Sequence, residues 1–331
     1  MTAALDSTLP RSPGRSLGVQ LTDDDRSAVE ALAQGFVHNG AAPLDSPEWQ
    51  EQARLASCQL PARLTQAIRR YRHDAGSAGT LSVTNLPIVT NVLPPTPHAP
   101  DSVERAATTP ATVAVLLAQQ LGEVIAYRDE KQGALVQNVV PIRSLSRSQS
   151  NGGSVPLEFH TENAFHPNRP DFVGLLCLRP AHEGGVGTYV ASIRQALPLL
   201  EDKDRAILRE SRFVTAAPPS FRSADRTAPH PLLSGDADDP DICVDFYATT
   251  ALDETAAVSM ERLRVALMSV RTGLVLRPGD MVFLDNRLVV HGRGAFTPRY
   301  DGTDRWLHRV FVHLDNRRSR PRRTGGGAVL V

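Results

Sequence analysis

The order of the secondary-structure patterns along the chain is the feature that most constrains its fold. Apolar residues at helical spacing dominate the first third of the chain, and short strand-like runs dominate the rest. The early helical patterns lie at 22–36, 47–55, 64–71 and 112–121. The strand-like runs lie at 79–83, 134–141, 157–159, 172–178, 187–191, 242–246, 273–276, 281–284 and 306–314, with two further helical stretches at 192–200 and 254–270. Alternating βαβ units would interleave the two patterns throughout, so this order favours a β-rich α+β fold, a β core wrapped by helices.

The length of 331 residues fits one large domain or two small ones. Residues 1–18 are rich in Ser, Pro and Arg, and we expect a flexible leader there. We expect a single domain over 19–316, helical to about residue 130 and β-rich beyond it. The Arg- and Gly-rich residues 317–331 are predicted to form a flexible tail.

Charge and cysteine usage narrow the function classes. Lys plus Arg and Asp plus Glu are both 36, so the chain lacks the positive field that dominates nucleic-acid binding. It has no apolar run of the ~20 residues that a membrane span needs, and no apolar secretory signal. Its cysteines, Cys58, Cys177 and Cys243, are too few and too far apart for a disulfide framework. We expect a soluble cytoplasmic protein that binds neither nucleic acid nor membrane.

A His-x-Glu pair, His160 and Glu162, lies in an extended segment. Residues i and i+2 of a strand point to the same side, so both side chains can face one ion. A distant second histidine would complete a 2-His-1-carboxylate set, which leaves three positions open on Fe(II). The pair alone is a weak signal, because 10 His and 36 acidic residues predict about one such pair by chance, and 313–315 holds another.

A second cluster strengthens the metal hypothesis. A turn signal at 277–280 precedes a buried strand pattern at 281–284, and the chain then reaches His291. Arg305 follows fourteen residues later, where its planar guanidinium could grip the far carboxylate of a dicarboxylate cosubstrate. The pair at 313–315 lies beyond this arginine, and we interpret it as structural.

The chain resembles the clavaminate synthase-like oxygenases, which depend on Fe(II) and 2-oxoglutarate and include asparagine and arginine β-hydroxylases of peptide-antibiotic pathways. The resemblance extends from about 107 to about 316 and is strongest in 157–162, 235–240 and 298–310. It implies a double-stranded β-helix, or jelly-roll, core with flanking helices and a site inside one mouth of the barrel.

The resemblance also implies roles for individual residues. His160, Glu162 and His291 match the iron ligands, and Arg305 matches the arginine that holds the distal carboxylate of 2-oxoglutarate. Thr188 matches a threonine that also contacts this cosubstrate. Fe(II), 2-oxoglutarate and O₂ are therefore the expected cofactors, in a 2-oxoglutarate-dependent non-haem iron dioxygenase.

Four residues match contacts to an amino-acid substrate. Arg309 follows Arg305 by four residues, on the same face of a strand, and matches the group that binds the α-carboxylate. Ser150, in a polar loop, matches a serine beside that carboxylate, and Gln137 matches a glutamine near the ammonium group. Glu162 is expected to contact substrate as well as metal.

Asp245 is the candidate residue for binding the substrate side chain. It lies in the apolar run 242–246, where an unpaired carboxylate would be costly to bury. It matches the aspartate that binds a distal amide or guanidinium in the family. Some arginine hydroxylases carry a second acid at the companion position, which here is Cys243, and this weakens the case for arginine.

These residues predict hydroxylation of an L-amino acid with a polar or cationic side chain, at its β-carbon, in specialised-metabolite or peptide-antibiotic biosynthesis. Candidate substrates are L-arginine, a cyclic guanidino amino acid, L-lysine and L-asparagine.

The alternatives to this reaction are cyclisation or desaturation of a modified amino acid, as by clavaminate synthase, and hydroxylation of an amino acid on a peptidyl carrier protein. A zinc hydrolase could use the same ligands, but the chain has no His-Glu-x-x-His. A metal-free binding barrel would need a broken ligand set, and all three ligands are present. The amino acid, its stereochemistry and the oligomeric state stay open.

Overall fold

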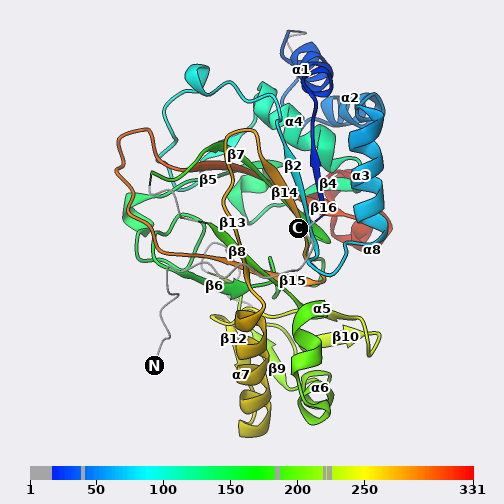
Figure 1. The fold of residues 1–331 in the computed structure, drawn as a ribbon, viewed down its shortest axis with the longest axis vertical. Coiled ribbons are helices and arrows are strands. Elements are labelled where there is room, and N and C mark those ends of the chain that lie inside the picture. The colour runs from blue at the N-terminus through cyan, green and yellow to red at the C-terminus, as the bar shows by residue number, and fades with distance from the viewer. Residues whose placement is uncertain (1–16, 39–41, 183–186, 219–220, 222–225) are drawn as a thin grey trace.

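The structure, a computed structural model, describes residues 17–38, 42–182, 187–218, 221 and 226–331 (Figure 1). Its α-helices are α1 (Asp23–His38), α2 (Pro47–Ser57), α3 (Ala62–His73), α4 (Thr109–Ala118), α5 (Ile193–Ala196), α6 (Asp202–Leu208), α7 (Glu254–Ser269) and α8 (Asn316–Ser319). Its 3₁₀ turns are η1 (Thr90–Val92), η2 (Lys131–Gly133), η3 (Arg143–Leu145), η4 (Leu197–Leu199), η5 (Arg320–Arg322) and η6 (Thr324–Gly326). The strands are β1 (Leu17–Gln20), β2 (Thr80–Thr84), β3 (Val103–Glu104), β4 (Glu123–Tyr127), β5 (Val136–Val139), β6 (Leu157–His160), β7 (Phe172–Arg179), β8 (Thr188–Ser192), β9 (Phe213–Thr215), β10 (Leu233–Gly235), β11 (Pro240–Ile242), β12 (Thr249–Ala251), β13 (Thr272–Leu274), β14 (Met281–Asp285), β15 (Val289–Arg293), β16 (Trp306–His313) and β17 (Val329–Leu330).

Two sheets form the centre of the molecule. The larger, with nine described strands, runs β1-β2-β14-β7-β16-β4-β17, and β5 and β3 extend it from the other half of the β16 edge. The smaller runs β13-β8-β15-β6 and is antiparallel throughout. Side chains of both sheets, among them Leu175 from β7 and Leu157 from β6, line one cavity, so the two sheets face each other. The mixed helix-and-sheet class predicted from the sequence is confirmed.

Local capping explains where the early helices begin. Thr22 accepts a hydrogen bond from the Asp25 backbone N–H (3.1 Å) at the start of α1, and Ser46 accepts one from Trp49 (3.2 Å) at the start of α2. The side chains of α4 are nearly all buried, because this helix lies between the large sheet and the helices α1 and α2 (Figure 1). The helices α5–α7 lie at the other end of the molecule, next to the small sheet (Figure 1).

The C-terminal residues, which were predicted to form a flexible tail, make specific contacts in the structure. Residues 316–319 form α8, whose Arg318 pairs with the Asp171 carboxylate (3.1 Å). The Arg323 guanidinium donates to Ser319 Oγ (2.8 Å), and β17 pairs in parallel with β4 at the sheet edge, where Leu330 is buried. Composition alone counted the arginines as solvated, whereas each of these two finds a partner in the folded chain.

The N-terminal prediction is only partly within the described residues. Residues 1–16 of the expected leader lie outside them, and Leu17 and Gly18 belong to β1, which pairs in parallel with β2. Within the ranges that the structure describes, no helix has the length and apolar character needed to cross a membrane.

Candidate active site

Three side chains of metal-ligand type converge where β6 and β15 pair. One ligand atom each from His160, Glu162 and His291 lies within 4.8 Å of the other two. The two histidines are cross-strand partners whose ring centroids are 4.3 Å apart, and Glu162 Oε2 lies 3.4 Å from His291 Nε2. Strand pairing thus brings together ligands from two distant segments.

Backbone contacts orient two of these ligands. The His160 Nδ1–H donates to the carbonyl oxygen of Glu158 (2.9 Å), which leaves the Nε2 lone pair for a metal. Asn286 holds the backbone of Glu162: its side-chain oxygen accepts from the Glu162 N–H (2.8 Å), and its amide donates to the Glu162 carbonyl (3.0 Å). The same amide also donates to the carbonyl of Pro170 (2.8 Å).

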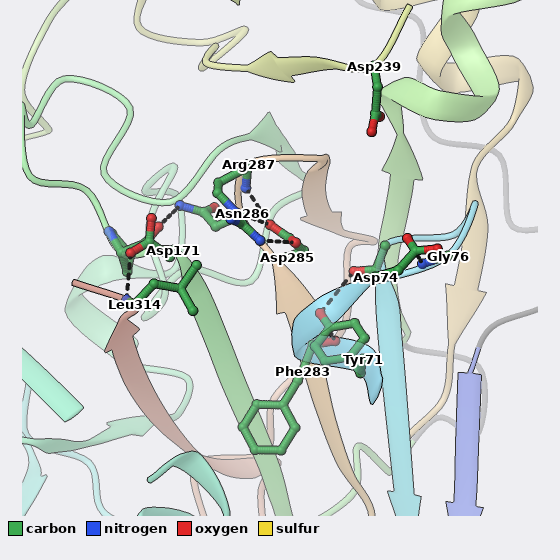
Figure 2. Close-up of polar contacts among 12 residues, drawn as sticks. Tyr71, Asp74, Gly76, Asp171, Asp239, Phe283, Asp285, Asn286, Arg287 and Leu314 are labelled. Atoms are coloured by element: carbon green, nitrogen blue, oxygen red, sulfur yellow. Dashed lines mark hydrogen bonds and ion pairs between the residues drawn. The ribbon is translucent and has the colours of Figure 1, made fainter. Parts of the chain in front are cut away.

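A polar network fixes Asn286 in turn (Figure 2). The Asn286 backbone N–H donates to the carbonyl oxygen of Asp171 (2.9 Å), and the Asp171 carboxylate accepts from the Leu314 N–H (2.8 Å). On either side of Asn286 in the chain, Arg287 and Asp285 form a two-point ion pair, the shorter contact being 2.6 Å. The ligand Glu162 is therefore tied to the frame of the large sheet.

The electrostatics suit a bound cation. Burial by itself would raise the pKa of the Glu162 carboxyl, but Arg309 and the two histidines outweigh it and hold that pKa far below its usual range. Burial, together with the neighbouring His160, lowers the pKa of His291. Glu162 is thus a carboxylate and His291 a neutral imidazole at pH 7, the protonation states that ligate metals. Two imidazoles and one carboxylate fit Fe(II), which supplies the O₂ chemistry when bound.

A buried arginine marks a second part of the site. Arg305, just before β16, lines two small cavities of about 40 and 30 Å³, and Thr188 from β8 lines both. Burial lowers the pKa of Arg305 to about 10, and its guanidinium has no hydrogen-bond or ion-pair partner within the part of the chain described here. A buried, unpaired guanidinium calls for an anion, so these residues fit the distal carboxylate of 2-oxoglutarate.

A larger cavity, of about 270 Å³, lies on the other side of the ligand set. It is lined by His160, Glu162, Ser150 and Asp245, among others, and Glu162 also lines the 30 Å³ cavity. The Ser150 hydroxyl is buried and without a partner in the described residues. This cavity therefore brings together three of the predicted substrate residues and two of the ligands.

Arg309 and Gln137 lie behind this cavity rather than in its wall. Arg309 is fully buried and donates to Glu162 (2.9 Å), to Glu130 and to Gln137 Oε1 (3.1 Å from Nε). The oxygen of the Asn151 amide, in the orientation that satisfies both groups, accepts from Arg309 at 2.6 Å. Gln137 thus positions Arg309 in this structure, and its contact with a substrate ammonium group stays a prediction.

Asp245 is placed differently from the sequence expectation. The run 242–246 is not one strand: β11 ends at Ile242, and Asp245 makes an isolated bridge with His160 before a turn. Asp245 Oδ1 accepts the backbone N–H groups of Tyr247 (2.9 Å) and Ala248 (3.1 Å). The carboxylate is therefore half-buried and partly satisfied, because the turn supplies donors that the apolar pattern did not reveal. No hydrogen bond from a described residue reaches Oδ2.

Sequence reasoning missed several polar residues of the site. Asn286 and Glu130 carried no motif of their own, and their partners lie far away in the chain. Asn151 lines the large cavity from a loop and Lys131 from the short 3₁₀ turn η2, where the sequence offers no periodic pattern. Arg293 could have been found, because it follows His291 by two residues and so shares its face of β15.

The comparisons with known proteins agree with this geometry. Residues 111–311 match the family described as taurine catabolism dioxygenase TauD, TfdA. The chain belongs to the TauD/TfdA dioxygenase family. It is 44% identical to an L-asparagine oxygenase of Streptomyces coelicolor, over 96% of each chain. It is 34% identical to an L-lysine 3-hydroxylase of Catenulispora acidiphila, over 99% of this chain and 92% of that protein. It is 33% identical to clavaminate synthase 2 of Streptomyces clavuligerus, over 80% of this chain and 83% of that protein.

A solved structure is as similar to this chain as the L-asparagine oxygenase sequence is. An asparagine oxygenase in complex with Fe(II), 2S,3S-3-hydroxyasparagine and succinate matches with a TM-score of 0.93 and 44% identity, covering 96% of this chain and 99% of that one. The predicted relationship to the clavaminate synthase-like oxygenases is confirmed, as is the enzyme class, a 2-oxoglutarate-dependent non-haem iron dioxygenase using Fe(II), 2-oxoglutarate and O₂. The zinc hydrolase alternative is excluded by this membership.

Proposed function

We propose that this enzyme hydroxylates a free L-amino acid at its β-carbon, with L-asparagine as the preferred substrate. The proposal is supported by the likeness to an L-asparagine oxygenase over nearly the whole chain and by the position of Asp245. It keeps the predicted reaction and selects one of the four candidate substrates.

The observation that carries the proposal is the bridge between Asp245 and His160. Direct cross-strand partners have Cβ atoms about 4.5–5.5 Å apart, so the Asp245 carboxylate lies next to a metal ligand. A substrate whose β-carbon faces the metal would then reach Asp245 with a short side chain. The asparagine amide, one bond beyond the β-carbon, can donate to the open Oδ2, whereas L-lysine and L-arginine would have to extend past it.

The large cavity also offers partners for the groups that all amino acids share. The substrate ammonium group can find Glu162, and the substrate carboxylate can find Ser150 and the arginine behind it. Arg309 remains our candidate for the α-carboxylate.

We also propose that the two facing sheets form the double-stranded β-helix implied by the family resemblance. Its support is the antiparallel four-stranded sheet β13-β8-β15-β6, which faces the large sheet across the cavities of the site.

The three cysteines are all unpaired, which supports the expected cytoplasmic location.

The test is a substrate screen on reconstituted enzyme. The protein is loaded anaerobically with Fe(II) and 2-oxoglutarate, O₂ is admitted with one free amino acid at a time, and products with one added oxygen atom are identified by mass spectrometry. We expect L-asparagine to give the highest kcat/KM, with succinate formed in step with product. A higher kcat/KM for L-lysine or L-arginine would overturn the choice of substrate. Succinate formation that no free amino acid stimulates would favour the carrier-bound alternative instead.

A further inference from the structure

Two arginines, not one, are buried at the cosubstrate cavity. Arg293 from β15 and Arg305 are both buried and line the same 30 Å³ cavity, together with Thr188 and His291. The guanidinium of Arg293 lacks a charged partner: its Nε has no hydrogen bond, its two hydrogen bonds to backbone carbonyls of the loop at 151–155 are long, 3.4 and 3.3 Å, and it stacks 5.1 Å from the centroid of the Phe296 ring. No carboxylate among the described residues forms an ion pair with either guanidinium.

This arrangement is unusual for a protein interior. Buried charges are normally paired, because an unpaired ion loses its hydration without compensation. Elsewhere in the site the rule holds, since Arg309 is paired with Glu130 and Glu162. Two unpaired guanidinium groups at one small cavity therefore indicate a place for an anion that the chain itself does not supply.

Strand register directs Arg293 toward that place. Arg293 is the direct cross-strand partner of Thr188 on β8, so the two side chains lie on the same face of the small sheet. It also shares that face with the ligand His291, two residues earlier on β15. A register shift against β6 lies between them, and Gly292 lets the strands approach closely, since a Cβ there would lie 2.6 Å from the Leu157 carbonyl oxygen.

We propose that Arg293 is a second cosubstrate-binding residue, which holds the distal carboxylate of 2-oxoglutarate together with Arg305 and Thr188. Arg305 approaches from the large sheet, and Arg293 and Thr188 approach from the small one. Two guanidinium groups on opposite walls select a dicarboxylate over a 2-oxo acid that lacks the distal charge. The inference depends on the use of 2-oxoglutarate and is independent of which amino acid is hydroxylated.

The competing explanation is that Arg293 only braces the loop at 151–155. That loop borders the large cavity, and its Asn151 also lines the 30 Å³ cavity, so loss of a mere brace would affect metal-chelating ligands with and without a distal carboxylate alike. Binding measurements without turnover distinguish the two roles.

The experiment measures anaerobic binding of two metal-chelating ligands to the Fe(II)-loaded enzyme by isothermal titration calorimetry. 2-Oxoglutarate carries the distal carboxylate, and oxalate keeps two-point chelation of the metal but lacks that group. We expect Arg293→Gln to weaken 2-oxoglutarate about tenfold or more, the effect of one lost charged hydrogen bond, and to leave oxalate within about twofold. Arg305→Gln should show the same pattern.

Arg271→Gln is the matched control, because Arg271 also bonds a backbone carbonyl, that of Met268 (3.1 Å), but lines none of the three cavities. It should leave both affinities unchanged. Unchanged 2-oxoglutarate binding in Arg293→Gln, or an equal loss for both ligands, would overturn the proposal.

If the glutamine variant does not fold, Arg293→Lys serves as the second variant. It keeps the charge but not the planar fork, and it should weaken the binding of 2-oxoglutarate selectively by a smaller factor. Equal affinities of Arg293→Lys and wild type for 2-oxoglutarate would count against the assignment. Failure of the wild type to bind 2-oxoglutarate would instead contradict the cofactor.

Discussion

The two sides of the ligand set are formed by different kinds of secondary structure. On the cosubstrate side, Arg293 and Thr188 lie on paired strands and Arg305 immediately precedes one, around cavities of only about 30–40 Å³. On the amino-acid side, a cavity of about 270 Å³ is lined largely by turns and loops, among them the Ser150 loop and the Asp245 turn. Glu162 borders both sides.

This difference indicates which part of the structure determines specificity for the cosubstrate and which part determines specificity for the amino acid. Strand pairing holds a side chain through many backbone hydrogen bonds, which suits a ligand that every member of a family must bind in the same way. Loops tolerate substitution and change of length without loss of the sheet, which suits a substrate that differs between relatives. Relatives that act on asparagine and on lysine, by their names, fit a common strand wall and a variable loop wall.

Removal of a ligand shared by both sides should have the largest effect. His160→Ala or His291→Ala leaves two protein ligands, so we expect Fe(II) binding and succinate formation to fall to background while the fold survives. Metal content and succinate are measured on the same samples, with circular dichroism as the check on folding. His98→Ala, at an exposed histidine, is the control and should behave as wild type. Full succinate production by either ligand variant would refute the ligand set.

A change on the loop side should alter only the amino acid. Asp245→Asn removes the charge that accepts the substrate amide, so we expect kcat/KM for L-asparagine to fall about tenfold or more, the scale of a charged hydrogen bond. The ratio of L-aspartate to L-asparagine turnover should rise, because the repulsion between carboxylates is lifted. Asp241→Asn makes the same change on β11, outside the three cavities, and should leave the ratio unchanged. An unaltered preference in Asp245→Asn would mean that this carboxylate serves only the turn.

A change on the strand side should alter only the cosubstrate. Arg305→Lys keeps the charge but loses the two-point grip, so the apparent KM for 2-oxoglutarate should rise about tenfold while the KM for the amino acid is maintained. Both constants come from initial rates of succinate formation, each with the other substrate saturating. The opposite result, a changed amino-acid KM alone, would show that the roles of Arg305 and Arg309 are exchanged.

The large sheet should also be sensitive to acid through one buried histidine, and this is the smallest expected effect. His308, on β16, is fully buried with no partner at either ring nitrogen within the described residues, and burial lowers its pKa to about 3. Its unfolded pKa is about 6.5, so the unfolded chain binds the extra proton first as pH falls. This histidine should leave stability unaffected above about pH 6.5 and reduce it by up to about 1.4 kcal/mol per pH unit between there and its folded pKa.

His308→Leu should remove that contribution to the slope. The measurement is the free energy of unfolding in urea at several pH values, for wild type and variant. The two slopes should differ below about pH 6.5 and agree above it. Parallel slopes across the acid range would show that His308 is protonated without cost in the folded state.

Much of the site followed from spacing along single segments. The predicted pairs do meet, since Glu162 lies with His160 and Arg305 lines the same cavity as Arg309, although Glu162 follows β6 in a turn and Arg305 precedes β16. The early helices could also be predicted, because their caps and apolar spacing are local. The tail could not, because composition says nothing of whether Arg323 or Leu330 will find a partner.

The sequence by itself therefore indicated the chemistry: the candidate metal ligands, the arginine expected to bind the cosubstrate and the class of reaction, carried by two short segments of the chain. Only the tertiary structure decided the partners. It tied Glu162 to Asn286, placed Asp245 across from His160 in a turn and set Arg293 opposite Thr188. The physical reason is that periodicity fixes which face of a segment a side chain occupies, whereas the identity of its neighbour depends on register between segments that the sequence separates widely.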